Sequence, residues 1–163
     1  MAEGQTYEAS VRAAWAGEIY GEALFSELAH LAGDTALASK WKTLAMLERV
    51  TGEQLAPLVS RYGFDTEPPT EEAERGLVTA REFAEMPHAE FMALIEPYLE
   101  DVISRFEALR DAAPAEDRTT MQFLVDHEVA LLRFVQLERS GADKDSTRVA
   151  GALIERVRSL ETA

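Results

Sequence analysis

Three glutamates have the residue type and spacing that suggest chemistry. Glu22, Glu48 and Glu128 each stand near the middle of a helical pattern, inside a stripe of apolar residues that recurs every three to four positions. A buried ionised carboxylate requires a cation, a proton or a set of hydrogen bonds, because desolvating the bare charge is costly. Carboxylate oxygens are ligands for hard cations and for iron or manganese. The three residues therefore predict a shared polar centre, and a dimetal centre is one way to build it.

Three further residues are candidate ligands because each lies on the flank of an apolar helix face, two of them beside Glu22 and Glu128 and the third on the predicted helix 87–112. Glu18 precedes Glu22 by one turn on the flank of its helix, and the alternative is a partly solvated side chain. His127 adjoins Glu128, also on a flank, where the alternative is a histidine bonded to a neighbour. Asp101 would reach the centre after a small rotation of its helix.

A metal-free interpretation rests on Arg105, which lies on the apolar face of its own predicted helix. A guanidinium can pair with a carboxylate through two hydrogen bonds and so neutralise buried acids without a metal. In this alternative Arg105 is the counter-charge of the three glutamates. A third alternative is that the assumed phase of a helix is wrong.

The elements that would position these residues are helices, since the periodicity is helical throughout and shows no convincing strand. Asp34 is a suitable N-cap and Pro114 suits the first turn of a helix, whereas Pro68 and Pro69 break the chain. Long helices are expected at about 7–31, 35–62, 87–112 and 114–139, with a short helix within 70–86 and a fifth, shorter one at 147–160.

The loop lengths predict how these helices are connected. Tight loops make the first two and the last two long helices antiparallel hairpins, and the connection 63–87 is long enough to run back along the bundle. The expected fold is therefore all-α, a single domain over 1–163. It consists of a four-helix bundle at 7–140 with one long crossover and a short C-terminal fifth helix.

This arrangement resembles a known superfamily. The crossover bundle with "GEIYGE" on the first helix, "MLERVTGE" on the second and "LVDHE" on the fourth is similar to the ferritin-like, rubrerythrin-type di-iron carboxylate proteins. The resemblance covers about residues 7–140. It implies a Glu from one helix of each hairpin and a Glu-x-x-His motif from the other.

Glu22, Glu48 and Glu128 match three of the six ligands that the resemblance implies. Thr51 and Leu131 stand where the two histidines are expected, and Val102 stands where the fourth glutamate is expected. The ligand set is therefore degenerate. The resemblance implies an oxidase, an oxygenase or an iron-handling protein.

Composition excludes other classes of function. The net charge is −14, which disfavours nucleic acid and anionic lipid as partners. The chain has no cysteine, so disulfides, iron–sulfur clusters and thiolate zinc sites are excluded. The stretch "MAEGQTYEAS" lacks the basic and apolar regions of a signal peptide, and no apolar run is long enough to span a membrane. These features predict a cytoplasmic protein.

Two functional hypotheses follow. The first is a carboxylate-bridged dimetal protein that holds iron or manganese. The second is a metal-free bundle that acts as a binding or structural module, with the acids neutralised by Arg105. A small-molecule ligand in the bundle core and a homodimer are compatible with both, and whether the protein is an enzyme stays open.

Overall fold

The structure is a computed structural model that describes residues 6–161, and in this part of the chain the secondary structure is entirely helical. The all-α class expected from the sequence is confirmed. Six α-helices and one 3-10 turn follow in the order α1 (Tyr7–Leu31), α2 (Thr35–Arg61), α3 (Thr70–Ala84), α4 (His88–Asp111), α5 (Arg118–Ser140), η1 (Asp143–Asp145) and α6 (Arg148–Glu161).

Local sequence signals fix where several helices begin and end. Thr6 and Asp34 cap α1 and α2, each side chain accepting a hydrogen bond from the backbone N–H three residues further on. Gly63 and Gly141 follow α2 and α5 with φ of 79° and 75°, a left-handed conformation that glycine adopts without a Cβ clash. The cap expected at Asp34 is therefore present.

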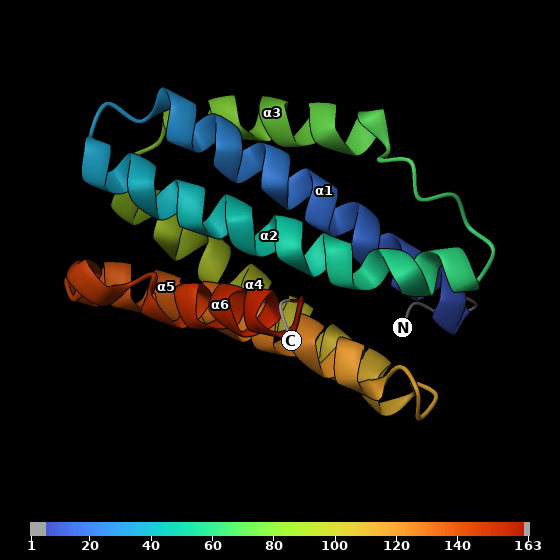
Figure 1. The fold of residues 1–163 in the computed structure, drawn as a ribbon. Coiled ribbons are helices and arrows are strands. Elements are labelled where there is room, and N and C mark those ends of the chain that lie inside the picture. The colour runs from blue at the N-terminus through green and yellow to red at the C-terminus, as the bar shows by residue number, and fades with distance from the viewer. Residues whose placement is uncertain (1–5, 162–163) are drawn as a thin grey trace.

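The helices form two antiparallel hairpins, α1 with α2 and α4 with α5, while α6 packs across α2 and α5 (Figure 1). The ring of Tyr7 at the start of α1 lies 5.9 Å from that of Tyr62 after α2. The ring of Trp41 near the start of α2 lies 5.8 Å from that of His88 at the start of α4. Hence α4 runs parallel to α2, and the connection that carries α3 spans the length of the molecule.

Helix α3 packs along α1 on the outside of the first hairpin (Figure 1). Gly76 makes this approach close. A Cβ at this position would lie 3.0 Å from the Ala23 Cβ and 3.1 Å from the Leu24 nitrogen, and closer still to the Tyr20 carbonyl oxygen. The absence of a side chain at Gly76 thus lets the two backbones come together.

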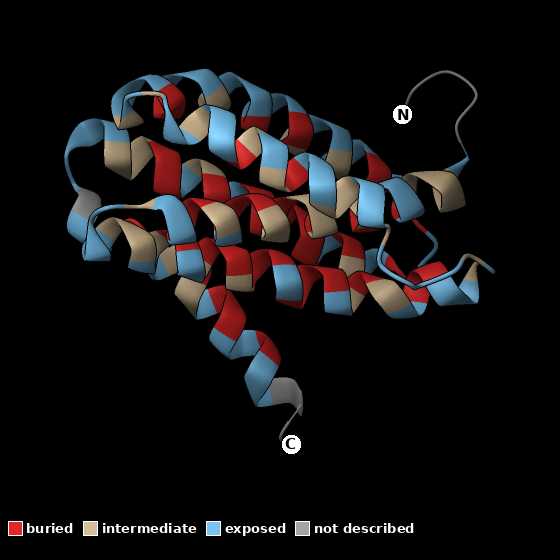
Figure 2. Ribbon diagram, turned by 90° about the horizontal axis from the view of Figure 1, so that it is seen from above, coloured by how far each residue is buried: buried red, intermediate tan, exposed pale blue. Residues whose placement is uncertain are grey.

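The core consists of two apolar clusters. Figure 2 shows in red the buried residues along each helix. Trp41 and Phe134 belong to one cluster, and Trp15 and Leu124 to the other. Both tryptophans are buried in the core. Near the middle of α1, α2 and α5, where residues of the two clusters approach one another along the chain, buried polar side chains interrupt the apolar ones: Glu18, Glu48, Thr51, His127 and Glu128. A polar layer therefore divides the apolar core.

Helix α4 packs mainly against α5, and a cavity separates it from α1. Tyr98 is 62% exposed, and Leu94 is also exposed. Both are exposed because the face of α4 that carries them borders this cavity instead of another helix. None of the helices in the described part of the chain combines the length and apolar composition that a membrane span requires.

Candidate metal centre

Four side chains from three helices meet in the polar layer. Glu18 comes from α1, Glu48 from α2, and His127 and Glu128 from α5. Their residues are between 1% and 7% exposed, so little of their surface reaches bulk water. Burial of this many ionisable groups is unusual unless they are paired with one another or with a metal ion.

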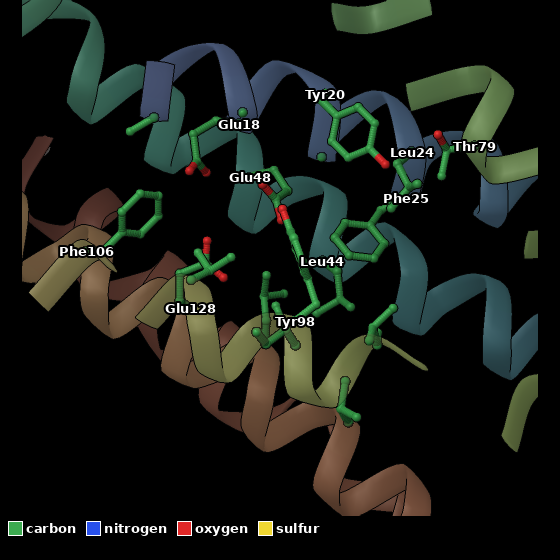
Figure 3. Close-up of a pocket in the computed structure, with 18 of the residues that line it drawn as sticks. Glu18, Tyr20, Leu24, Phe25, Leu44, Glu48, Thr79, Tyr98, Phe106 and Glu128 are labelled. Carbon is green, nitrogen blue, oxygen red and sulfur yellow. The ribbon is translucent and has the colours of Figure 1, made fainter. Parts of the chain in front are cut away.

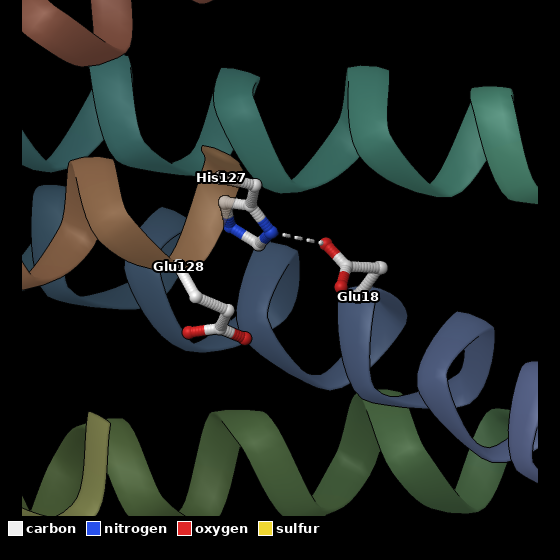
Figure 4. Close-up of side chains that lie close together, drawn as sticks. All are labelled: Glu18, His127 and Glu128. Atoms are coloured by element: carbon white, nitrogen blue, oxygen red, sulfur yellow. Dashed lines mark ion pairs between the residues drawn. The ribbon is translucent and has the colours of Figure 1, made fainter. Parts of the chain in front are cut away.

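The imidazole of His127 lies between two of the carboxylates. Its Nε2 is 3.2 Å from Oε1 of Glu48, and this N–H donates a hydrogen bond to that carboxylate. Its Nδ1 is 3.3 Å from Oε2 of Glu18 (Figure 4). A carboxylate bonded to one ring nitrogen of a histidine fixes the ring and leaves the other nitrogen available as a metal ligand.

On the other side of the imidazole, one ring nitrogen and the carboxylate oxygen beside it lack a hydrogen-bond partner. Nδ1 of His127 and Oε2 of Glu18 are buried, and neither forms a hydrogen bond to another described residue, although they approach one another. Buried polar atoms are nearly always satisfied, so these two atoms have the capacity to bind a further partner that approaches both of them from one side. Glu128 faces the same space (Figure 4).

Glu18, His127 and Glu128 offer ligand atoms that all lie within 4.8 Å of one another. Bonds of about 2.1 Å place the ligands of one ion roughly 3.0 Å apart when adjacent and roughly 4.2 Å apart when opposite. The three side chains therefore fit one divalent ion after small adjustments. Glu48 then orients His127 through its contact with Nε2, on the other side of the ring, and does not need to be a ligand of the ion.

The surroundings shift the protonation of these groups in the absence of a metal. Burial raises the pKa of Glu128 to about 7, with the neighbouring Glu48 adding to the shift. Burial also raises the pKa of Glu18 well above its usual range. Burial alone would lower the pKa of His127, but Glu18 and Glu48 together raise it to about 10. Without a metal, His127 is therefore a cation among acids.

Gly21 makes room for the carboxylate of Glu48. A Cβ at this position would lie 2.5 Å from Cδ and 3.0 Å from Oε1 of Glu48, and closer still to Oε2. Gly17, one turn earlier, has nothing within 4 Å of the same point. Glycine inside a helix costs roughly 1 kcal/mol of stability relative to alanine. At position 21 the Glu48 carboxylate leaves no room for alanine, whereas nothing near position 17 excludes it.

The polar layer opens onto a cavity of about 870 Å³ between α1, α3 and α4, with α2 and α5 behind it. Figure 3 shows Glu18, Glu48 and Glu128 directed toward this space, with the ring of Phe106 beside them. The remaining walls are mainly apolar, and His127 is not among the lining residues. The arrangement therefore offers a buried polar centre beside a largely apolar space for a small molecule.

The structure removes Glu22 from the expected ligand set. Its side chain is 31% exposed and accepts a 2.8 Å hydrogen bond from the Nε of Arg49 at the surface. The expectation that Glu22 is buried beside Glu48 and Glu128 is wrong. Positions four apart differ by about 40° around a helix, and α1 is covered by both α2 and α3, which places Glu18 at the centre of the buried arc.

Asp101 and Arg105 are also placed differently from the expectation. They form an ion pair with each other, 3.1 Å between Nε and Oδ2, and their side chains are 70% and 56% exposed. Asp101 is therefore not a ligand in this structure. Arg105 borders the cavity, but the counter-charge inside the layer is His127.

Sequence reasoning placed His127 and Glu18 on the flanks of their helices, whereas the structure buries both. It overlooked Gly21 altogether. The signal was present in "GEIYGE", where two glycines stand in the middle of a long helix that would be more stable with alanine.

Comparison with known proteins gives no relative for this chain: no protein-family model, no curated protein and no solved structure matches it. The site must therefore be interpreted from its own geometry.

Proposed function

We propose that this protein is a ferritin-like metalloprotein that binds iron or manganese through Glu18, His127 and Glu128. The observation that carries the proposal is the buried trio of ligand atoms within 4.8 Å, two of which lack any hydrogen-bond partner. Two hairpins joined by a connection that spans the molecule support the ferritin-like comparison.

The ligand count favours one ion per chain over the dimetal centre expected from the resemblance. Glu22 and Asp101 are at the surface, so the layer provides three ligands, and Glu48 orients His127. Three protein ligands leave coordination positions open, as catalytic metal sites do. Two carboxylates and one imidazole suit manganese and iron, which accept both oxygen and nitrogen ligands.

The chain's own residues define what such a site can do. When bound, the ion would supply a Lewis acid and a one-electron redox centre. The apolar walls of the cavity exclude water around a bound molecule and strengthen electrostatic interactions there. Glu48 holds the imidazole through Nε2 and so keeps Nδ1 directed at the ligand cluster.

A metal-free binding module is the second candidate, and His127 is the observation that favours it. A protonated imidazole between Glu18 and Glu48 balances part of the negative charge without a metal. In this alternative the layer is a permanent ion-pair network, and the cavity alone carries the function.

The test is metal content and affinity in wild type, Glu128→Leu and Glu22→Gln. After iron or manganese supplementation and dialysis, we expect about one ion per wild-type chain by elemental analysis. We expect the same for Glu22→Gln, since Glu22 pairs with Arg49 at the surface, and a loss of binding for Glu128→Leu. Two ions per chain would support the dimetal version.

Denaturant unfolding with and without manganese separates the alternatives further. In a metal site the free energy of unfolding of the wild type rises with manganese concentration, because the ion binds the folded chain, and Glu128→Leu removes this rise. In a permanent network with His127 the stability of both proteins does not depend on manganese. Wild-type protein that retains no metal at millimolar manganese or iron would refute the proposal.

A further inference from the structure

The cavity beside the acids is elongated and mainly apolar. The residues of α4 that border it run from Phe91 to Leu109, a distance of about 27 Å at roughly 1.5 Å per residue. Protein interiors are close-packed, and a void of about 870 Å³ lies in the range of small-molecule sites. The exposure of Leu94 and Tyr98 is consistent with a face that a ligand completes.

Two arginines stand at the edge of this cavity. Arg105 of α4 and Arg75 of α3 both line it, with side chains 56% and 62% exposed. Glu128 lines the same cavity as Arg105, and Arg75 lies over the ring of Tyr20, 4.7 Å from its centre. Both guanidinium groups are therefore cations at the edge of an otherwise mainly apolar space.

The present partners of these arginines are weak. Each is paired with an acid on its own helix, Asp101 for Arg105 and Glu72 for Arg75. Exposed pairs of this kind contribute little to stability, so a ligand can replace them. A carboxylate offers two oxygens to the planar guanidinium fork, which makes it the preferred partner.

We propose that the cavity binds an aliphatic carboxylic acid, with its carboxylate at Arg105 and its chain along the apolar wall between α1 and α4. The inference rests on the proposed function in one respect: a bound metal ion neutralises the acids of the polar layer, which would otherwise repel the ligand. It deepens that function by naming the class of molecule held beside the ion.

Calorimetric titration with three eight-carbon probes tests the inference on manganese-loaded protein. Octanoate, 1-octanol and octylamine share a chain and differ in the head group. We expect octanoate to bind once per chain, about tenfold or more tighter than octanol, and octylamine to bind weakest. A factor of ten corresponds to about 1.4 kcal/mol. Octanoate that binds no better than octanol would overturn the inference.

Variants connect the affinity to named residues. Arg105→Gln should weaken octanoate about tenfold and leave octanol within about twofold. Arg49→Gln, which removes an exposed arginine away from the cavity, should change neither. Gly17→Leu should weaken both probes, because Gly17 lines the cavity and has open space at its Cβ position. Circular dichroism confirms that each variant is folded.

The outcomes separate this inference from the proposed function. Manganese binding without a preference for octanoate refutes the ligand class and leaves the metal site intact. Absence of manganese binding refutes the metal site. Under that condition, tighter binding of octylamine than of octanoate overturns the carboxylate inference as well, since the free acids then select a cation.

Discussion

Replacing Gly21 by alanine tests the geometry of the polar layer at one atom. The new Cβ would lie 2.5 Å from Cδ and 3.0 Å from Oε1 of Glu48, whereas ordinary contacts begin at 3.4 Å. The carboxylate must therefore move by roughly 1 Å. The end of a glutamate side chain is flexible, but this one is buried and accepts the 3.2 Å hydrogen bond from His127.

The expected magnitude follows from two opposing effects. Alanine in place of glycine inside a helix contributes about 1 kcal/mol of stability. Loss of a hydrogen bond to a buried charged group costs about 1.5–3 kcal/mol. We therefore expect Gly21→Ala to lower the free energy of unfolding of the metal-free protein by about 0.5–2 kcal/mol.

Gly17→Ala is the matched control on the same helix. Nothing lies within 4 Å of its added Cβ, so it should raise the free energy of unfolding by up to about 1 kcal/mol. The two variants should thus differ by roughly 1.5–3 kcal/mol in chemical denaturation. The same displacement should weaken manganese binding about 10- to 100-fold, since Glu48 orients the ligand His127. If Gly21→Ala stabilises the protein as much as Gly17→Ala does, the described contact between Gly21 and Glu48 is wrong.

Three other predictions concern the fold and its protonation. Because the pKa of Glu128 is raised to about 7 in the folded state from 4.5, the metal-free protein should lose on the order of 3 kcal/mol of stability as pH rises from 4.5 through 7. Glu128→Gln should reduce that loss in denaturation at several pH values without abolishing it, because the pKa of Glu18 is also raised, and a wild-type stability that rises over this range would contradict the assignment. Asp117 is fully buried and accepts hydrogen bonds from two tyrosines and an arginine. Asp117→Ala should therefore lower the free energy of unfolding in urea by about 2–4 kcal/mol. The exposed Asp111→Ala is the control and should have no measurable effect. Gly76→Ala should lower the melting temperature because its Cβ would meet the backbone of α1, whereas Gly151→Ala, with open space around it, should not.

The sequence by itself determined the helices and much of the centre's composition. Periodicity and caps placed the helix boundaries within a few residues, because these signals are local and the capping side chain of Asp34 bonds the backbone three residues away. It also singled out Glu48 and Glu128 as buried acids, since each interrupts an apolar stripe, and both are buried.

Only the tertiary structure decided which face of each helix is central. Glu18 and Glu22 differ by about 40° around α1, less than the width of an apolar stripe, so periodicity cannot choose between them. The choice is made by α3, which packs on α1 through Gly76 and extends its buried arc, while Glu22 reaches Arg49 at the surface. The cavity between α1 and α4 likewise exposes Arg105, which the sequence pattern placed on the apolar face of its helix. The space between two helices depends on how all the others hold them apart, and that is not a property of either helix alone.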